Sequence, residues 1–511
     1  MSVPLAGTIS GLASRAGSLF RGATALSMAG QRDLSFGVLD AQSACFAGGL
    51  AARGVRRGDR VLLHLPNGAE WLIAYHALAR LGAVVVPVNT LLTSSEVAYM
   101  AADADVAAMI VPAARREAIH QARGWERRLL TILTDASTED GFEALLSGHP
   151  LDPIEVAPDD LFTICYTSGT TGRPKGAIQT HRAVFASAAM TAMVHGRVRG
   201  ETVLTALPFT HVYGNVVMNA ALLVGMRLVV LPRFDPGEAL AAIGKEGPAL
   251  FEGVPTMYYQ MLTHPGIDAT DFSSLRCCTV GGQTMPLARI DEVVARFGCP
   301  LCELWGMTEV AGPAMSHSPH WPPRHGSIGL PFPNVETRLA SLDDKDHAAA
   351  DGEPGELLVR GPQVTPGYWR DPVATDQSIA SDGWLATGDI AVRDADGYFR
   401  IVDRRKDVII TGGYNIYPAE LEQVLSLHPS VAMVAVAPMV DLEKGELAKA
   451  FVVLRPGTQC TAQQLDRHCR DHLAPYKVPR LYVFVDDLPK SSTGKILRRE
   501  LREAIPPAPM P

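Results

Sequence analysis

One loop rich in Gly, Ser and Thr decides the fold, and it reads Tyr166-Thr167-Ser168-Gly169-Thr170-Thr171-Gly172-Arg173-Pro174-Lys175-Gly176. The apolar, partly β-branched run 161–165 precedes it and predicts a buried strand. The Ala-rich segment 181–193 follows it and is suited to a helix. Glycines let backbone N–H groups approach an anion closely, hydroxyls add donors, and Lys175 adds a positive charge. The stretch therefore predicts a polyphosphate-binding loop at the end of a strand.

A flexible linker and a Walker P-loop are the two alternatives for this stretch. A flexible linker does not place a single Lys-Gly pair after a proline, directly behind an apolar strand. A Walker P-loop needs Gly-Lys followed by Ser or Thr, whereas Lys175 follows Pro174 and precedes Gly176. The Walker pattern is therefore not met.

The stretch resembles, almost letter for letter, the phosphate-loop signature of the adenylate-forming (AMP-binding) superfamily. That superfamily comprises acyl-CoA synthetases, nonribosomal adenylation domains and luciferases. The resemblance implies that the loop holds the phosphates of ATP, through Thr167, Ser168, Gly169, Thr170, Thr171, Gly172 and Lys175. Five further stretches fit the same family in the same order, so the resemblance extends over most of the chain.

The bulk composition is that of a globular protein with two or more domains. The chain has 511 residues, too many for one hydrophobic core, and 47% are hydrophobic and 20% charged. A net charge of −8 gives no basic footprint for nucleic acid. No apolar run reaches the length of a membrane span, and the N-terminal stretch lacks the pattern of a signal peptide. We expect a cytoplasmic protein without a transmembrane segment, and a homodimer is left open.

The eight cysteines predict neither disulfide bonds nor a metal site. Eight cysteines in so long a chain are too few for a disulfide framework. Cys277 and Cys278 lie side by side in an apolar run that is typical of core. Cys299 and Cys302 form a C-x-x-C, but no second pair with zinc spacing accompanies them.

The order of the predicted elements indicates an α/β fold with several parts. Helical and strand patterns alternate through 34–150 and again through 201–282, which predicts parallel sheets with crossover helices. From Asp351 onward the strands shorten and Gly, Pro and Asp become frequent, which indicates a small β-rich subdomain. We expect a large N-terminal catalytic domain over 1–402 and a small, mobile α+β C-terminal domain over 403–511.

The pentapeptide Trp305-Gly306-Met307-Thr308-Glu309 resembles the family's adenine and metal motif. An aromatic ring, a hydroxyl and a carboxylate together suit adenine, an α-phosphate and Mg²⁺. The resemblance implies that Trp305 lies against the adenine, Thr308 reaches the phosphate and Glu309 binds the metal. Gly306 and Met307 belong to the same ATP-binding segment.

The next two motifs are assigned to the ribose and to a domain hinge. Asp389 closes a segment, 384–389, that resembles the motif whose aspartate accepts hydrogen bonds from the ribose hydroxyls. Taken alone, an aspartate after a glycine would be interpreted as a turn residue. Arg404 matches the family's second ribose contact, and Asp403 matches the hinge about which the C-terminal domain swings.

Two C-terminal motifs resemble segments that serve the two half-reactions of the family. Gly412, Gly413 and Tyr414 resemble the segment beside the pantetheine channel of coenzyme A in the thioester-forming state, with a simple turn as the alternative. Lys495 matches the catalytic lysine of a Pro-Lys-x-x-x-Gly-Lys loop. A cation is needed there because the attacking carboxylate and the α-phosphate are both negative. Lys490, the first lysine of that loop, is given no catalytic role.

The acid is expected to lie beside a histidine and an apolar run. His211 borders the carboxylate end of the acyl pocket in similar ligases, and a core histidine is the alternative. A fatty or aryl acid is favoured by four apolar residues, Val212, Val216, Val217 and Met218. Arg233 and Arg276 instead offer partners for a second carboxylate. The candidate pocket residues, of which the last two also adjoin the nucleotide, are Tyr213, Gly214, Val254, Gly281, Gly282 and Gln283.

Taken together, the motifs imply an ATP-dependent acid–thiol ligase. A carboxylic acid would attack the α-phosphate of Mg²⁺-bound ATP to give an acyl-adenylate and pyrophosphate, and coenzyme A would then displace AMP. We expect a medium- to long-chain fatty acid, with an aryl or short dicarboxylic acid as the alternative. The rivals are an adenylation enzyme that loads a carrier protein, a luciferase-like oxidase and an inactive binding protein. The chain ends soon after Lys495, which favours coenzyme A over a fused carrier.

Overall fold

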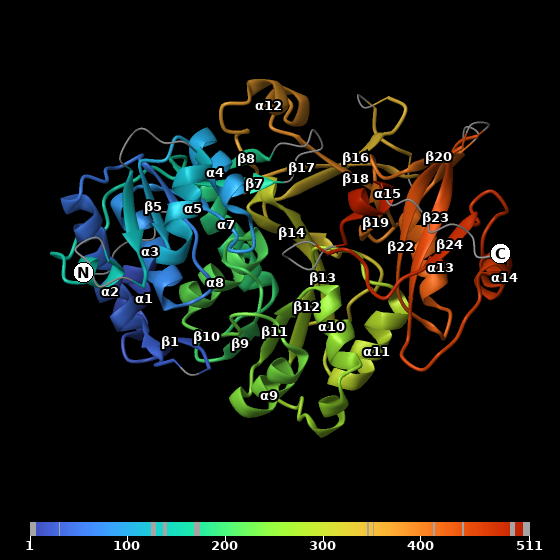
Figure 1. Ribbon diagram of the computed structural model, residues 1–511, viewed down its shortest axis with the longest axis horizontal. Helices are drawn as coiled ribbons and strands as arrows, with labels where there is room; N and C mark the ends of the chain where they lie inside the picture. The colour runs from blue at the N-terminus through green and yellow to red at the C-terminus, as the bar shows by residue number, and fades with distance from the viewer. Residues whose placement is uncertain are drawn as a thin grey trace.

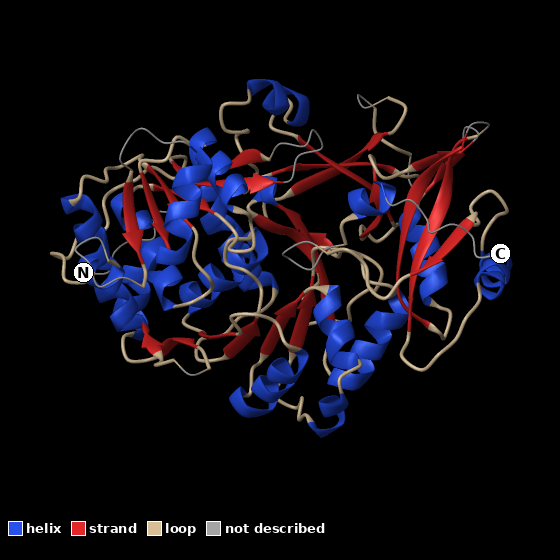
Figure 2. Ribbon diagram, viewed as in Figure 1, coloured by secondary structure: helices blue, strands red, loops and turns tan. Residues whose placement is uncertain are grey.

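The computed structural model describes residues 7–29, 31–123, 129–135, 141–167, 174–344, 347–350, 352–411, 414–441, 444–490 and 496–503. Within these ranges the strands form four sheets, and helices separate and cover them (Figure 1, Figure 2). The described chain starts beside the first two sheets, and its last described element is a helix, α15 (Arg498–Glu503), that packs on a separate sheet (Figure 1).

The first sheet has six strands and carries the phosphate-loop candidate at one edge. Its strands are parallel except for the last pair, β7 and β8, which are antiparallel. In sheet order they are β6 (Leu130–Leu133), β5 (Ala108–Val111), β3 (Arg60–Leu63), β4 (Val84–Pro87), β7 (Leu161–Thr167) and β8 (Lys175–Thr180). The strand expected before the loop is present as β7, whereas β8 was not predicted.

The second sheet has nine strands, mostly parallel, and carries the adenine-motif candidate. Its order is β15 (Leu330–Pro331), β14 (Gly312–Ser316), β13 (Leu301–Met307), β12 (Cys277–Val280), β11 (Leu250–Gly253), β9 (Thr202–Thr205), β10 (Arg227–Val230), β1 (Thr24–Ser27) and β2 (Leu34–Ser35). The antiparallel pairs lie at the two edges, where β13, β14 and β15 pair in sequence and β1 pairs with β2.

Helices fill the space between these two sheets. Helix α3 (Ala69–Leu81) contacts β3 and β4, α7 (His181–Val194) contacts β8, and α8 (Val212–Val224) contacts β10 and packs on α7. In α3 every residue from Trp71 to Leu81 is buried, as expected for a helix covered on all sides. One continuous apolar cluster therefore joins the helices to both sheets.

The remaining helices of this N-terminal part are α1 (Leu12–Phe20), α2 (Phe36–Ala52), α4 (Ser94–Asp103), α5 (Ala113–Arg123), α6 (Phe142–Leu145), α9 (Pro236–Glu246), α10 (Pro255–Leu262), the 3₁₀ helix η1 (Pro265–Ala269) and α11 (Leu287–Phe297). Of these, α1 and α2 pack on α8 and α3 respectively. Helices α9, α10 and α11 follow one another along the nine-stranded sheet (Figure 1).

A four-stranded antiparallel sheet follows, as the shortened strand pattern predicted. Its order is β16 (Glu336–Ser341), β17 (Gly355–Arg360), β18 (Leu385–Arg393) and β19 (Phe399–Arg404), and α12 (Pro372–Ser378) precedes β18. Asp403, the hinge candidate, is buried in β19 and pairs in register with Ile390.

We call residues 405–503 the C-terminal unit, which has apolar clusters of its own. Its sheet runs β21 (Tyr414–Ile416), β20 (Ile409–Thr411), β23 (Gly445–Leu454) and β22 (Val431–Asp441), and β24 (Leu481–Phe484) also pairs with β23. Three helices, α13 (Pro418–Ser426), α14 (Ala462–His472) and α15 (Arg498–Glu503), accompany this sheet.

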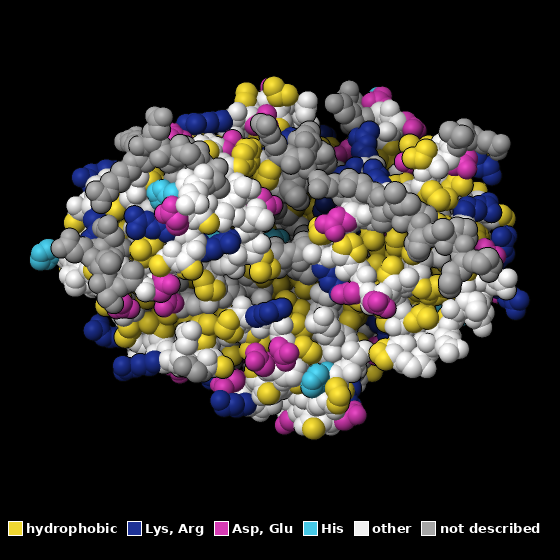
Figure 3. Space-filling view, viewed as in Figure 1, with side chains coloured by type: hydrophobic (Ala, Val, Ile, Leu, Met, Phe, Trp, Pro, Cys, Tyr) yellow, Lys and Arg dark blue, Asp and Glu magenta, His cyan; other side chains and the backbone are white. Residues whose placement is uncertain are grey.

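The expected fold class is confirmed, with parallel-sheet α/β parts, a small β-rich part and a terminal α+β unit. Cys277 and Cys278 are fully buried, as predicted for core residues. Across β12 and β13 the sulfurs of Cys277 and Cys302 are 3.6 Å apart, and all eight cysteines are free thiols. In the described residues no helix is long and apolar enough to cross a membrane. On the face shown in Figure 3, Lys and Arg side chains are scattered among Asp and Glu rather than gathered in a stripe.

Candidate active site

Three of the predicted nucleotide residues meet where the nine-stranded and four-stranded sheets touch. Trp305 lies near the end of β13 and donates its indole N–H to Oδ2 of Asp389 at 2.7 Å. The guanidinium of Arg404 lies 3.1 Å from the other oxygen of the same carboxylate. Asp389 on β18 and Arg404 on β19 are register partners, so the antiparallel ladder places them side by side. Both oxygens of Asp389 are thus oriented by neighbouring donors.

The metal and phosphate candidates lie immediately beyond, on the 3₁₀ turn η2 (Thr308–Val310). Glu309 is buried, and one carboxylate oxygen accepts a hydrogen bond from the hydroxyl of Tyr368 at 2.9 Å. The Lys175 ammonium lies 5.6 Å from the centre of the Tyr368 ring. The carbonyl of Thr308 accepts from the side-chain amide of Gln179 at 2.8 Å. Gln179 therefore connects β8 to η2.

The expected phosphate loop joins β7 to β8. Thr167 closes β7 opposite Lys175, and its hydroxyl lies 3.5 Å from the carbonyl oxygen of Lys175. The two ends of the loop are thereby held together at the edge of the six-stranded sheet. The central loop residues lie outside the described part of the chain, namely Ser168, Gly169, Thr170, Thr171 and Gly172.

Glu309 fits a magnesium ion that is held partly by a substrate. Among the described residues no group of three or more His, Cys, Asp or Glu side chains could hold a metal ion by itself. Mg²⁺ in nucleotide sites commonly takes one or two carboxylates and completes its shell with phosphates and water. A single buried carboxylate, oriented by Tyr368 and close to Lys175, is consistent with that arrangement.

Close packing explains the glycines after β12. A Cβ added to Gly281 would lie 2.3 Å from Cδ1 of Leu304, so even an alanine would collide with β13. Gly282 has φ +90°, in the left-handed region that favours glycine. Gly282 is exposed and Gln283 is half-buried, which leaves this turn accessible beside β13.

A similar close approach occurs inside the adenine motif. A Cβ on Gly306 would lie 2.1 Å from the carbonyl oxygen of Gly312 on β14. The ladder between β13 and β14 is irregular at this point, between Trp305 and Gly306. Met307, the last residue of β13, is half-buried. Glycine at 306 therefore lets the strand bend and lead directly into η2.

His211 begins helix α8 rather than lying in the core. Its Nδ1 accepts the backbone N–H of Tyr213 at 3.2 Å, as an N-cap side chain does, and the residue is half-buried. The alternative of a core histidine is therefore wrong.

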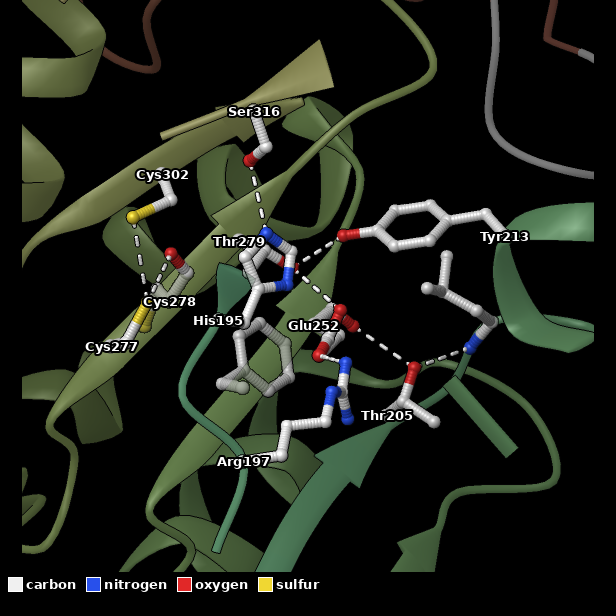
Figure 4. A network of polar contacts seen from close by, with 12 residues as sticks. His195, Arg197, Thr205, Tyr213, Glu252, Cys277, Cys278, Thr279, Cys302 and Ser316 are labelled. Carbon is white, nitrogen blue, oxygen red and sulfur yellow. Dashed lines mark hydrogen bonds and ion pairs between the residues drawn. The ribbon is translucent and has the colours of Figure 1, made fainter. Parts of the chain in front are cut away.

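A buried polar network holds the side of α8 that faces the nine-stranded sheet (Figure 4). The hydroxyl of Tyr213 shares a 2.5 Å hydrogen bond with Thr279 of β12, and Thr279 donates to Glu252 of β11 at 2.7 Å. Glu252 also forms an ion pair with Arg197, and both side chains are fully buried. Burial raises the pKa of Tyr213 well above its usual value, so the phenol stays protonated. Tyr213, a candidate pocket residue, is thus fixed in one orientation.

The two arginines considered for a second carboxylate differ in their surroundings. Arg276 forms an ion pair with Glu201 at 2.7 Å and donates to the carbonyl oxygens of His195 and Gly196. Arg233 is exposed, just after β10. Arg276 is therefore engaged by its own neighbours, and the structure gives no support to its pairing with a dicarboxylic acid.

The C-terminal candidates are spread over the C-terminal unit. Tyr414 lies on β21, is 60% exposed, and packs its ring on Tyr476 with the ring centres 4.8 Å apart. Lys490, which was given no catalytic role, pairs with Asp487 at 2.5 Å. Gly412, Gly413 and Lys495 lie outside the described residues.

Tyr368 is a site residue that the sequence did not indicate. It directly follows Gly367, in the segment between β17 and α12. Its hydroxyl contacts the predicted metal residue Glu309, which lies more than fifty positions earlier in the sequence. Burial and the neighbouring Glu309 carboxylate both raise the pKa of Tyr368, so it remains a hydrogen-bond donor. The only available signal was an aromatic residue in a Pro-Gly-Tyr-Trp turn, 366–369, which is common in loops.

Comparison with protein families identifies what this site belongs to. A model described as "AMP-binding enzyme" matches residues 14–369, and a model of the C-terminal domain of that enzyme family matches residues 420–495. The chain belongs to the AMP-binding enzyme family. The resemblance to the adenylate-forming superfamily is thereby confirmed.

The similarity to individual members of this family covers nearly the whole chain. The long-chain-fatty-acid–CoA ligase of Bacillus subtilis (strain 168) is 35% identical, over 97% of this chain and 94% of that protein. A feruloyl-CoA synthase of Amycolatopsis sp. is 37% identical, over 92% of this chain and 93% of that protein. The anthranilate CoA ligase AuaEII in complex with anthranoyl-AMP superposes with a TM-score of 0.91 at 28% identity and 98% coverage of both chains.

Proposed function

We propose that this AMP-binding enzyme is an AMP-forming acyl-CoA synthetase that activates a fatty acid. The observation that carries the proposal is the order of side chains at the end of β13. Trp305, with Asp389 and Arg404, forms a place for the nucleoside, and Glu309 with Tyr368 follows directly at the place for the phosphates. That order matches an extended ATP molecule, whose α-phosphate would lie between the two groups.

In the first half-reaction, the carboxylate oxygen of the acid would attack the α-phosphorus and pyrophosphate would leave. Thr167, Lys175 and the loop between them would bind the departing phosphates, and Thr308 would contact the α-phosphate. Lys495 would stabilise the negative charge where the two anions meet. His211, at the start of α8, would border the acid carboxylate.

Glu309 would hold Mg²⁺ together with phosphate oxygens of ATP. The ion would supply positive charge close to the phosphate oxygens. This charge would stabilise the negative charge that grows on the pyrophosphate as it leaves. Tyr368 supports this role because its hydroxyl donates to one oxygen of Glu309 and so orients the other.

In the second half-reaction, the thiol of coenzyme A would attack the acyl carbonyl and AMP would leave. We propose that the chain divides into domains 1–402 and 403–511, and that Asp403 is the hinge between the two reaction states. Asp403 accepts the backbone N–H of Ala419 at 2.9 Å, which ties the end of β19 to the first helix of the C-terminal unit. Gly412, Gly413 and Tyr414 would then line the pantetheine channel after rotation.

The acid is assigned from the character of the residues near His211. Val212, Val216, Val217 and Met218 on α8 are apolar and buried, which suits an alkyl chain. The relatives named above act on long-chain fatty acids, ferulate and anthranilate, so an aryl acid is the second candidate. The proposed partners are thus a carboxylic acid, ATP and coenzyme A; a homodimer and a cytoplasmic location stay predictions.

A panel assay tests the activity and the acid together. Purified protein is incubated with Mg²⁺, ATP and one acid at a time, and pyrophosphate, AMP and the acyl product are quantified with and without coenzyme A. The proposal expects equal amounts of AMP and acyl-CoA with fatty acids when coenzyme A is present. Pyrophosphate release without thioester would favour loading of a carrier protein, and release of ADP would overturn the proposal.

A further inference from the structure

Arg289 connects the nine-stranded-sheet region to the C-terminal unit. It lies on α11 and is only 6% exposed. One terminal nitrogen donates to the backbone carbonyl of Val431 at 2.7 Å and lies 3.4 Å from that of Ala432, both on β22. Glu292, one turn along α11, orients the other terminal nitrogen at 2.6 Å. Figure 1 shows α11 reaching up to the C-terminal elements.

A second ion pair reinforces the same contact. Glu292 also lies 3.7 Å from the guanidinium of Arg455, which directly follows β23. Val431 and Leu454 are register partners, so Arg455 and the start of β22 lie at one end of the C-terminal sheet. We call this contact, formed by Arg289 and Glu292 with Val431, Ala432 and Arg455, the α11 latch.

The α11 latch is separate from the contacts at the proposed hinge. Near Asp403, Arg405 pairs with Glu356 of β17 at 2.7 Å and donates its backbone N–H to the carbonyl oxygen of Gly388. A rigid unit that is held at its pivot can still rotate, whereas a second contact away from the pivot fixes its orientation. Rotation about Asp403 must therefore break the contact between Arg289 and β22.

The exposed residues of the C-terminal unit indicate which state the structure represents. Tyr414 is 60% exposed and Ile410 is 56% exposed, although this edge is the one expected beside the pantetheine channel during thioester formation. The Tyr414 ring packs on Tyr476 of its own unit. An edge that faces solvent is not lining a channel, which favours the other state, in which the adenylate forms, for the present orientation.

We infer that Arg289 is a positioning residue that holds the C-terminal unit in the adenylate-forming orientation. The inference rests on the proposed function, because it requires two half-reactions in two orientations. Arg289 contacts no proposed substrate position, and it acts through the carbonyls at the start of β22. A charge-assisted hydrogen bond to a buried carbonyl favours the state that makes it, and it is absent from the other state.

The ratio of the two half-reaction rates reports the ratio of the two orientations. If each half-reaction proceeds from one orientation and exchange is fast, each rate is proportional to the population of its state. Loss of the charge-assisted bond from one state changes that population ratio by about tenfold. The rate of adenylate formation divided by that of thioester formation should fall by the same factor.

The test compares Arg289→Met with Arg296→Met on the same helix. Methionine keeps the apolar length of arginine and removes the donors. Arg296 is a matched control because it pairs with Asp268 within the N-terminal part. Adenylate formation is measured by exchange of pyrophosphate into ATP, and thioester formation by adding coenzyme A to purified acyl-adenylate. We expect the rate ratio to fall about tenfold in Arg289→Met, to recover partly in Arg289→Lys and to stay unchanged in Arg296→Met.

A structural readout separates failure of this inference from failure of the proposed function. Spin labels at Ala295→Cys on α11 and Arg467→Cys on α14, with Cys45 and Cys460 replaced by serine, report the distance across the contact. Arg289→Met should broaden or lengthen this distance whether or not the enzyme activates the acids tested. An unchanged distance distribution together with an unchanged rate ratio would overturn the inference. Absence of both half-reactions in the unmodified protein would instead overturn the proposed function.

Discussion

Trp305 donates its indole N–H to Asp389 at 2.7 Å, and this bond links β13 of the nine-stranded sheet to β18 of the four-stranded sheet. The motifs are separated by eighty-four positions, yet the two sheets bring them into direct contact. Arg404 holds the second oxygen of the same carboxylate. The nucleoside end of the proposed site is therefore held together by contacts among the protein's own side chains.

Trp305→Phe should weaken ATP binding through the orientation of Asp389. Phenylalanine keeps an aromatic face for adenine but removes the N–H, so one carboxylate oxygen loses its donor. We expect the KM for ATP to rise about tenfold, the lower end of the range for loss of one hydrogen bond to a charged group. Steady-state kinetics at saturating acid and coenzyme A measure this. If the KM for the acid rises instead, Trp305 belongs to the acid pocket and not to the nucleoside site.

Tyr368→Phe should raise the Mg²⁺ concentration that the reaction needs. The substitution keeps the ring beside Lys175 and removes only the hydroxyl that orients Glu309. Loss of a residue that orients a metal ligand typically lowers metal affinity by about tenfold or more. Titration of activity with Mg²⁺ at fixed ATP measures the shift. Tyr398→Phe, which changes a tyrosine stacked on His317 elsewhere, is the control and should leave the titration unchanged.

Lys495→Ala should slow adenylate formation by about a hundredfold or more, as for removal of a group that stabilises developing charge. Thioester formation from purified acyl-adenylate should change much less, because the α-phosphate attack is already complete. Lys490→Ala is the matched control from the same loop, since Lys490 pairs with Asp487. Equal losses in both half-reactions of Lys495→Ala would contradict its assignment to the first one.

The sequence predicted the fold well where pattern and packing agree. The strand before the phosphate loop and the helix after it are present as β7 and α7. Each was indicated by its own pattern, an apolar, partly β-branched run for the strand and an Ala-rich segment for the helix. Strand β8 was missed because Gly176 and Gln179 interrupt any apolar alternation, and its pairing comes from β7. Short strands that depend on a neighbour carry little signal of their own.

The site was predictable to the extent that its residues lie in recognisable motifs. Trp305, Asp389 and Arg404 were selected from three separate stretches, and the structure brings them together. Tyr368 and Arg289 were missed because their partners are a distant carboxylate and two backbone carbonyls. A contact to a backbone carbonyl leaves no residue type in the sequence that would indicate it.

Glu303 should make the stability of the protein depend on pH. Burial raises the pKa of this carboxyl from 4.5 to about 8, although the backbone N–H of Gly326 donates to it and lowers the pKa. The folded protein therefore binds this proton more tightly than the unfolded chain does. The stability from Glu303 is fully present below about pH 4.5 and is lost as pH rises through about 8.

Glu303→Gln should flatten this dependence, because the amide has no charge to bury. The free energy of unfolding, measured by denaturant titration from pH 5 to pH 9, should fall less steeply for the variant than for the unmodified protein. Each pKa unit corresponds to about 1.4 kcal/mol, so a gain of a few kcal/mol at most is expected above pH 8. The exposed Glu336, paired with Arg360, serves as control, and Glu336→Gln should change stability by less than about 0.5 kcal/mol. Parallel pH curves for all three proteins would show that Glu303 keeps its charge when folded.

The chain length of the acid should set the catalytic efficiency. An alkyl chain that enters the apolar region of α8 gains about 0.8 kcal/mol for each buried CH₂, or about fourfold in kcat/KM. Efficiency should therefore rise with each methylene until the pocket is full and then fall, while the KM for ATP stays nearly constant. Arg276 is engaged by Glu201, so Arg233 is the arginine left to test as a partner for a second carboxylate. Arg233 is exposed, and Arg233→Ala should leave the acid preference unaltered. A preference for malonate or another short diacid that is lost in Arg233→Ala would refute the apolar pocket and assign that arginine to the second carboxylate.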